Sequence, residues 1–241
     1  MSVAFPLLSS RTRALAAAAL LAVVAAPAAA RGREEVSRSF QKSVALPAGR
    51  RVSIDHSHGN LTVTSRKEPT VSINATIHVS SSSKDAAEGM SRDIRIEVEE
   101  TEGGLSVRTV YPERRGGFLG FGSLSFSVDY EIVMPELCPL SVHNRFGDVS
   151  VSGLRAGGDI ANSNGKLVLR DGAGSLRLEN SFGSIELAGS AGDASVVNAN
   201  GSVTASNIGG ELEIRNRFGR TGITKVGRRC VVASSNGDVI L

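Results

Sequence analysis

The sequence has no tryptophan, only two cysteines and few aromatic residues of any kind. After the N-terminal segment it has no second long hydrophobic run, so we expect the rest of the chain to be soluble or peripheral to a membrane. No Ser-His-Asp order, no Cys/His pair and no phosphate-binding loop stands out. We therefore predict that the protein is not an enzyme and that it needs no cofactor.

The N-terminus has the layout of a secretory signal peptide. Arg11 and Arg13 precede an apolar run over residues 14–26, and Ala28-Ala29-Ala30 follows Pro27 as a cleavage site of small residues. A membrane anchor is the alternative, but the run is shorter than the ~20 apolar residues that a spanning helix needs. No cysteine stands directly after the run, which argues against a lipoprotein. We expect residues 1–30 to be removed and the protein to be exported to the periplasm or the cell surface.

Charge gives no sign of a nucleic-acid partner. Arg11 and Arg13 are the only charged residues of the predicted signal peptide, so the rest of the chain holds nearly equal numbers of basic and acidic residues. Nucleic-acid binding needs a concentrated basic surface. We expect no such partner.

Glycine is abundant, and short alternations of Val, Ile and Leu run through the chain, which indicates an all-β protein with many turns. From residue 144 onward the sequence repeats with a period of 18 residues and no insertion. The five full repeats start with Asn (position 1), a partial sixth repeat starts with Ser234, and all six have Gly at position 4, where a tight turn is expected. The repeat asparagines are Asn144, Asn162, Asn180, Asn198 and Asn216, and the turn glycines are Gly147, Gly165, Gly183, Gly201, Gly219 and Gly237.

Each repeat carries two short strands. Positions 6 and 8, such as Val149 and Val151, and positions 15 and 17, such as Leu176 and Leu178, are apolar and alternate with polar residues. A single repeat cannot bury these residues, whereas stacked repeats form a continuous core. The sequence therefore predicts a parallel β-solenoid (β-helix) with rungs ~4.8 Å apart.

Positions 1 and 3 each form a column. The asparagines at position 1 are expected to point inward and to hydrogen-bond to one another and to the turn backbone; a row that binds a ligand is the alternative. Position 3 alternates strictly between Phe and Asn, from Phe146 and Asn164 to Phe218 and Asn236. An 18-residue rung would place Phe over Asn in one column, and a 36-residue rung would place Phe over Phe. We favour the first and leave the second open.

The N-terminal half is predicted to be an elaborated version of the same architecture. Residues 52–63 match the repeat, with His56 at position 1 and His58 at position 3, and form a first rung. A strand-rich insertion with at most one short helix, near residues 84–91, is expected to cap that rung. We thus divide the chain into a signal peptide over 1–30, an N-terminal β cap over 31–139 and regular repeats over 140–241.

The segments VSIDHSHGNLTV and VDYEIVMPELCPLSVHNRFGDVSVSG, followed by NSNG and NSFG turns, resemble a bacterial β-strand-repeat family of unknown function that is described as a putative adhesin. The resemblance covers roughly residues 45–241. It implies a β-solenoid of the cell envelope and brings no catalytic residues, and the adhesin description fixes no ligand.

Three groups of residues carry candidate chemistry. Asp55, His56 and His58 have the spacing of a metal site, but the two histidines occupy corner positions of the repeat, so we expect no metal. The acidic residues of the repeats are scattered, which favours a solvated charged face over a glycosidase pair. Cys138 and Cys230 would be about 24 Å apart, too far for a disulfide, so we expect two unpaired thiols with Cys230 buried.

One segment is a candidate interaction loop, because it is basic at one end and aromatic at the other. It could contact a membrane surface or a partner, although a hairpin tip folded onto the cap is the simpler reading. The residues of this loop are Arg114, Arg115, Phe118, Leu119 and Phe121.

Two functions remain. We favour a non-catalytic envelope protein that acts through its surface in adhesion, scaffolding or signalling, with an unknown envelope protein or polysaccharide as its partner. The alternative is a β-helix that binds or processes polysaccharide, which exposed phenylalanines at position 3 would favour. The sequence stops within a strand at Leu241, so edge-to-edge self-association is a further expectation.

Overall fold

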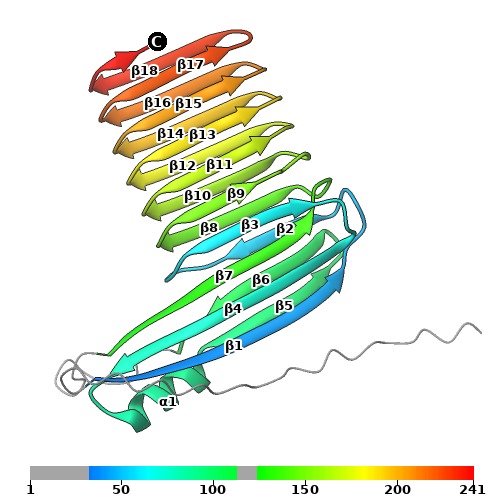
Figure 1. Ribbon diagram of the computed structural model, residues 1–241, viewed down its shortest axis with the longest axis vertical. Coiled ribbons are helices and arrows are strands. Elements are labelled where there is room, and N and C mark those ends of the chain that lie inside the picture. Colours follow the sequence, from blue (N-terminus) through cyan, green and yellow to red (C-terminus); the bar gives the residue numbers. More distant parts are fainter. Residues whose placement is uncertain (1–32, 113–123) are drawn as a thin grey trace, which may run out of the picture.

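A computed structural model describes residues 33–112 and 124–241 of the chain. Two sheets, one 10-stranded and one 9-stranded, lie against each other along the whole length of the described chain (Figure 1). One short helix, α1 (Lys84–Asp93), lies at the end opposite the C-terminus. The predicted all-β class and the short helix near residues 84–91 are both confirmed.

Each regular rung gives one strand to each sheet. All neighbouring strands of these rungs are parallel, because the chain travels once around the stack between equivalent positions. The 9-stranded sheet takes β8 (Leu140–Phe146), β10 (Gly158–Asn164), β12 (Leu176–Phe182), β14 (Ala194–Asn200), β16 (Leu212–Phe218) and β18 (Cys230–Asn236). The 10-stranded sheet takes β9 (Val149–Ser152), β11 (Leu167–Gly172), β13 (Ile185–Ser190), β15 (Val203–Ile208), β17 (Thr221–Val226) and β19 (Val239–Ile240).

The strand register decides the length of the rung. Asn162 pairs with Asn144 on one side and with Asn180 on the other, so residues one repeat apart are direct neighbours. Phe182 pairs with Asn164 and Asn200 in the same way. The 18-residue rung is therefore confirmed, and the 36-residue alternative is wrong.

The first rung and the layers beneath it come from the N-terminal half. β2 (Arg51–Asp55) and β3 (Leu61–Arg66) form the first rung and pair with β8 and β9. On their other side they pair with β6 (Gly104–Val110) and β7 (Ser125–Pro135), so the insertion covers the rung as predicted. The outermost layers are antiparallel and consist of β5 (Arg95–Thr101), β4 (Thr70–Ser81) and β1 (Glu34–Ala45).

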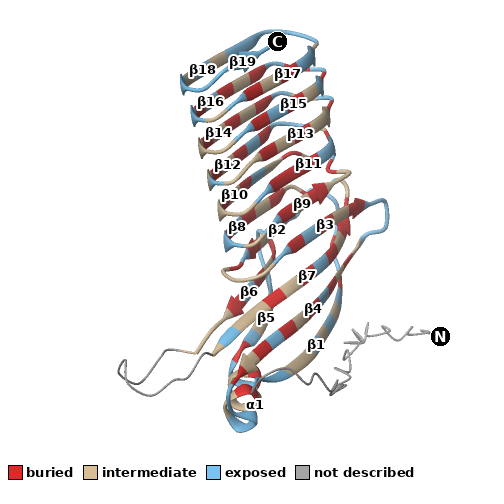
Figure 2. Ribbon diagram, turned by 60° about the vertical axis from the view of Figure 1, so that its left-hand side comes forward, coloured by how far each residue is buried: buried red, intermediate tan, exposed pale blue. Residues whose placement is uncertain are grey.

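A single apolar core fills the space between the sheets. Along β9, Val149 and Val151 are buried while Ser150 and Ser152 are half-exposed, and a similar alternation runs along β12 and β16 (Figure 2). The core runs from Val44 in β1 to Ile223 in β17 without a break. Because every interior rung is covered on both sides, the rungs of the stack support one another.

The structure differs from the sequence-based expectation at Cys230. This residue was expected in the core but is exposed, whereas Cys138 is buried. Cys230 starts β18, the last strand of its sheet, so only β16 covers it. Both thiols are free, as predicted.

Candidate functional site

The inner column of one corner consists of the position 1 asparagines. All five are buried, and their amide nitrogens donate to neighbouring asparagines and turn carbonyls. Asn144 Nδ2 donates to Asn162 Oδ1 at 3.0 Å, and Asn180 Nδ2 donates to the carbonyl oxygen of Gly165 at 2.8 Å. The side chains therefore satisfy backbone groups that the tight turn leaves without strand partners.

The turn itself requires glycine. Gly183 has φ 128°, and a Cβ atom built on it would lie 2.1 Å from the carbonyl oxygen of Gly165 in the rung below. A residue with a side chain rarely adopts this φ, and the neighbouring carbonyl oxygen leaves no room for a Cβ atom. The repeated glycine at position 4 thus follows from how closely successive turns stack.

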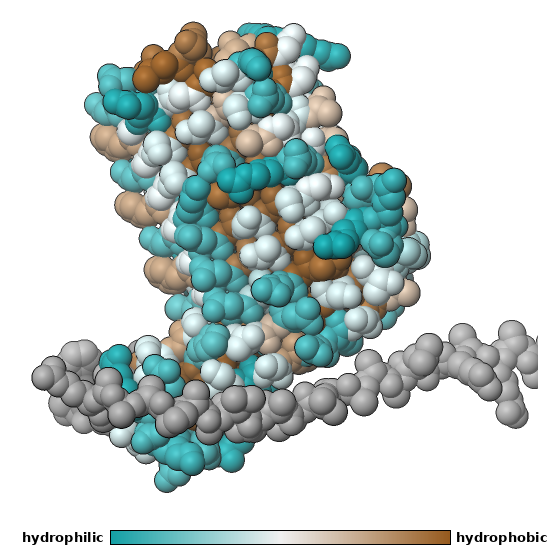
Figure 3. Space-filling view, viewed as in Figure 1, coloured by the Kyte–Doolittle hydropathy of each residue, from teal (hydrophilic) through white to brown (hydrophobic). Residues whose placement is uncertain are grey.

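The outer column of the same corner alternates between phenylalanine and asparagine. Phe146, Phe182 and Phe218 are 49%, 58% and 40% exposed, which is high for so large an apolar side chain. Along the left-hand edge of Figure 3, the side on which β8 to β18 end in Figure 1, projecting hydrophobic groups alternate with hydrophilic ones. We call this column the Phe–Asn ladder; it consists of Phe146, Asn164, Phe182, Asn200, Phe218 and Asn236.

The asparagines of the ladder are held in place by the backbone. Asn164 Nδ2 donates to the carbonyl oxygen of Arg145 at 3.1 Å, and Asn200 Nδ2 donates to that of Ser181 at 3.3 Å. The amide planes are thereby fixed between the phenyl rings. Since rungs are ~4.8 Å apart, successive rings of the ladder are roughly 10 Å apart.

An aromatic cluster continues the ladder at its N-terminal end. The imidazole of His58 stacks on Phe146, with ring centroids 5.2 Å apart and an interplanar angle of 24°. Tyr111 and Phe126 contact His58 at 5.3 and 5.2 Å. His58 occupies position 3 of the first rung, so its ring belongs to the same column.

The candidate metal residues are separated by the fold. The carboxylate of Asp55 is exposed and lies 3.8 Å from Arg108, whereas His56 is buried between the sheets. His56 Nδ1 lies 3.1 Å from Thr109 Oγ1, which lies 2.7 Å from the hydroxyl of Tyr130. Within residues 33–112 and 124–241, no three His, Cys, Asp or Glu side chains gather as metal ligands.

Burial shifts the pKa values of His56 and Tyr130. The pKa of His56 is lowered to about 4, first by burial and second by the nearby charge of His58. Burial also raises the pKa of Tyr130 to about 12. Both groups are therefore uncharged at neutral pH, because at His56 burial outweighs the nearby charges of Asp129 and Asp55.

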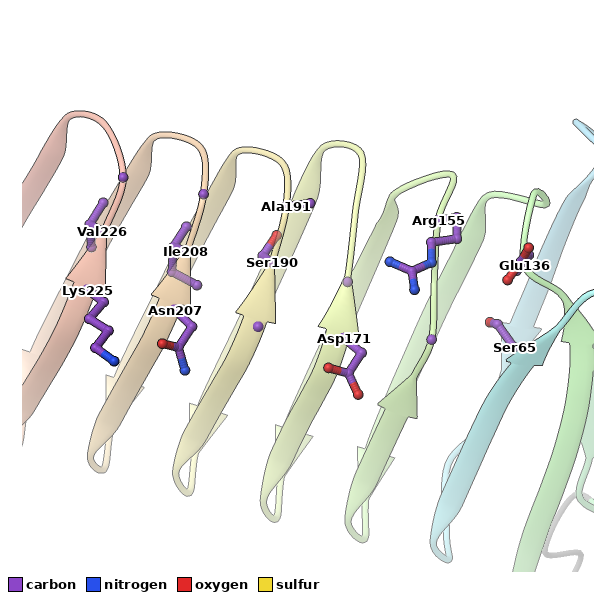
Figure 4. Close-up of a pocket in the computed structure, with 15 residues that line it drawn as sticks. Ser65, Glu136, Arg155, Asp171, Ser190, Ala191, Asn207, Ile208, Lys225 and Val226 are labelled. Atoms are coloured by element: carbon purple, nitrogen blue, oxygen red, sulfur yellow. The ribbon is translucent and has the colours of Figure 1, made fainter.

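A groove of about 760 Å³ runs along the opposite corner (Figure 4). Asp171, Asn207 and Lys225 lie at matching places along the stack and all have positive φ, between 55 and 58°. Asp and Asn adopt this conformation readily, but it is unusual for Lys. The groove is lined mainly by small side chains and backbone, and none of the residues that line it is aromatic.

Several acidic residues on the outer faces form ion pairs. Glu186 binds Lys166 at 2.7 Å and also Arg170, and the hydrogen bond from Lys166 is the main reason why the pKa of Glu186 is lowered. Glu213 lies 2.7 Å from Arg215 in the same manner. Such pairs are typical of a solvated charged surface.

The predicted interaction loop lies outside the described residues, and it stays a prediction. The strands on both sides of it lead to the aromatic cluster, because Tyr111 follows β6 and Phe126 lies in β7, with ring centroids 5.2 Å apart. The sequence reasoning located the Phe–Asn alternation but did not predict the link to His58, Tyr111 and Phe126. Only the pairing of β6, β7 and the first rung brings these rings together.

No family model matches the sequence, and no curated protein is similar to it. Among solved structures, the chain is similar to a putative cell adhesion protein from Clostridium sporogenes, with 11% identity, a TM-score of 0.44, and 84% of this chain and 99% of that chain covered. It is also similar to a putative adhesin from Bacteroides fragilis, with 13% identity, a TM-score of 0.40, and 84% and 97% covered. A putative lipid binding protein from Parabacteroides distasonis matches at 9% identity and a TM-score of 0.30, with 84% and 97% covered.

Similarities at this level carry no inference about a ligand. The described chain is a β-solenoid with 18-residue rungs, and its structural matches include bacterial proteins described as putative adhesins.

Proposed function

We propose that the protein is an exported, non-catalytic, adhesin-like interaction module of the cell envelope. The observation that carries this proposal is the Phe–Asn ladder, which places exposed phenyl rings at regular intervals on a rigid stack. Large exposed apolar side chains in a regular row are expected at a binding surface. Several outward carboxylates of the solenoid, Glu179, Glu186 and Glu213 among them, form ion pairs with Arg and Lys, which supports a binding role over an acid–base role.

Export rests on the sequence of residues 1–30, which lie outside the described residues. The charged start, apolar run and small-residue site support cleavage after Ala30. No helix in residues 33–112 and 124–241 has the length and apolar character to cross a bilayer. We infer that the folded part works in the periplasm or at the cell surface.

The export proposal is tested by producing the full-length chain in a bacterium and sequencing the N-terminus of the recovered protein. We expect a chain that begins at Arg31 and is found outside the cytoplasm. A chain that keeps Met1 and stays in the cytoplasm would overturn this part of the proposal.

The interaction proposal is tested by co-sedimentation of the exported chain with an insoluble cell-envelope preparation. We expect the wild-type protein to sediment with the envelope, and the variant Phe146→Ser/Phe182→Ser/Phe218→Ser to remain largely in solution. The variant Phe118→Ser/Phe121→Ser tests the predicted loop in parallel. If the wild-type chain does not sediment, the proposed function is wrong.

The second candidate, binding of polysaccharide, is favoured by the exposure of the same rings. Aromatic rings offer flat apolar faces, and a regular row of them suits a ligand that also repeats. Protease treatment of the envelope preparation separates a protein partner from a polysaccharide. Sedimentation that survives protease indicates polysaccharide.

A further inference from the structure

We propose that the Phe–Asn ladder binds an extended β-1,4-linked polysaccharide that carries at least one acidic group in each two-sugar repeat. This inference rests on the proposed function and names the class of its ligand. It is argued from the spacing of the ladder, the chemistry of its two side-chain types and the charge beside it.

The spacing of the ladder fits a two-sugar repeat. Phe146, Phe182 and Phe218 are separated by two rungs each, which is roughly 10 Å at the strand spacing of a sheet. In an extended β-1,4-linked chain each sugar is turned over relative to its neighbour, so equivalent faces recur after two sugars and over nearly the same length. One ring per two sugars can therefore stay in register along the stack.

The alternation of side chains fits the alternation of sugar faces. The stacking of His58 on Phe146 turns a ring face along the column, so the exposed C–H edge of the ring packs against the apolar C–H face of one sugar. The next position of the ladder holds Asn164 or Asn200, whose Nδ2 is bound to the backbone. No described residue donates to their Oδ1 atoms, which leaves these oxygens as acceptors for the hydroxyl or amide groups of the intervening sugar.

The rigidity of the ladder lowers the cost of binding. The asparagine amides are fixed by hydrogen bonds, and the rungs beneath them are held by the buried asparagines of position 1. Phe146 is further held by the stacked ring of His58. A surface that is already ordered loses little conformational entropy when a ligand binds.

The charges beside the ladder favour an acidic ligand. Arg145 and Arg217 directly precede Phe146 and Phe218 and take part in no ion pair of the described residues. The guanidinium carbon of Arg217 lies 5.2 Å from the ring centroid of Phe218. Acidic residues at this corner already have partners of their own: Asp148 accepts the backbone N–H of Lys166, Asp129 accepts that of Asn60, and Asp238 lies 4.0 Å from Arg220. Arg145 and Arg217 are therefore available for carboxylates of a ligand.

The test is calorimetric titration of the exported chain with a hexamer of β-1,4-linked mannuronic acid. We expect binding whose affinity rises steeply from the disaccharide to the hexamer, because additional rings engage as the chain lengthens. The hexamer of α-1,4-linked glucose, which coils, is expected not to bind. The neutral hexamer of β-1,4-linked N-acetylglucosamine is expected to bind several-fold more weakly than the acidic one.

Variants assign the binding to the ladder. Phe146→Ser/Phe182→Ser/Phe218→Ser should weaken binding by about tenfold or more, and Phe182→Ser alone should weaken it measurably. Leu137→Ser removes an exposed apolar side chain away from the ladder and should change nothing.

Arg145→Gln/Arg217→Gln should remove the preference for the acidic hexamer, whereas Arg66→Gln/Arg229→Gln should keep it. If the triple variant does not fold, the length series in the wild-type chain tests the binding and the single variant Phe182→Ser tests its place.

Two results would overturn the inference. The first is a wild-type chain that does not bind the acidic hexamer, and the second is a folded ladder variant that binds it as well as wild type. If either occurs while the wild-type chain still sediments with the cell envelope, the proposed function stands and only the ligand class is wrong. Equal binding of the acidic and neutral hexamers would overturn the role given to the two arginines.

Discussion

His56 stands at a position that asparagine occupies in the regular rungs. It is buried, and its Nε2 atom has no hydrogen-bond partner among the described residues. An imidazole in this environment is stable only when neutral, which is why its pKa is lowered to about 4. The first rung is therefore expected to be the acid-sensitive point of the stack.

Protonation of His56 should destabilise the folded chain. The pKa of the imidazole is about 6.5 when unfolded and about 4 when folded, so between these values the unfolded chain binds more protons. The contribution of His56 to the free energy of unfolding should be constant above pH 6.5. It should decrease as the pH drops towards 4, by an amount on the order of 3 kcal/mol. Urea unfolding of wild type and His56→Asn at several pH values measures it.

His56→Asn should flatten this part of the pH dependence, since Asn is the residue that the other rungs use. His143→Asn, which removes an exposed imidazole from the same sheet, should leave the dependence as in wild type. A slope that persists in His56→Asn would show that another group is responsible.

The substitution Gly183→Ala adds one carbon atom to a stacked turn and so tests how closely the turns stack. A Cβ atom there would lie 2.1 Å from a backbone oxygen, so Gly183→Ala should lower the free energy of unfolding by about 1 to 3 kcal/mol. Gly222→Ala is the matched control, because no atom lies within 4 Å of its added Cβ and its φ is not in the left-handed region. Equal stability of the two variants in thermal unfolding would refute this account of the glycine column.

Among the elements, β1 is the one that the sequence analysis did not predict. Its residues are polar along most of their length, and its burial alternates only weakly because it is the edge strand of its sheet. The repeat strands, in contrast, were predictable because each apolar pair recurs at a fixed spacing. For the insertion the sequence predicted only that it is rich in strands, and which strands pair could not be deduced from it.

The place of β1 is fixed by polar contacts that no local pattern encodes. The guanidinium of Arg38 donates to the carbonyl oxygens of Ser91 and Ile94, at the end of α1, and Lys42 Nζ donates to that of Val98 at 3.0 Å. These bonds link β1, in one sheet, to α1 and β5. The helix is therefore expected to depend on an arginine far from it in sequence.

Arg38→Met should loosen this link, because the carbonyl groups of Ser91 and Ile94 lose a charged donor. We expect faster amide hydrogen exchange in α1 and a loss of roughly 1 to 3 kcal/mol in the free energy of unfolding. Arg66→Met, in which the replaced residue is exposed at the end of β3, serves as the control. Unchanged exchange in α1 of Arg38→Met would mean that packing alone holds the helix.

Across the whole molecule, the sequence repeat predicts the structure of the interior rungs but not that of the last one. The 18-residue period, the corner asparagines and the Phe–Asn column follow from the sequence because each rung meets the same neighbours above and below it. The prediction for Cys230 was wrong because that rule does not hold for the last rung of the sheet. The sequence did not predict that the phenylalanines of the column are exposed. Position 3 lies at a corner, and there the alternation of a strand no longer determines which side a residue faces.

The account as a whole depends on the Phe–Asn ladder being the surface that binds. The most direct measurement is NMR of the exported chain with the acidic β-1,4-linked hexamer, with the phenylalanine rings and the backbone amides labelled. The account predicts shifts for Phe146, Phe182 and Phe218 and no shifts for the residues of the groove at the opposite corner. Shifts confined to that groove, at residues such as Asp171, Asn207 and Lys225, or no shifts at all, would contradict it.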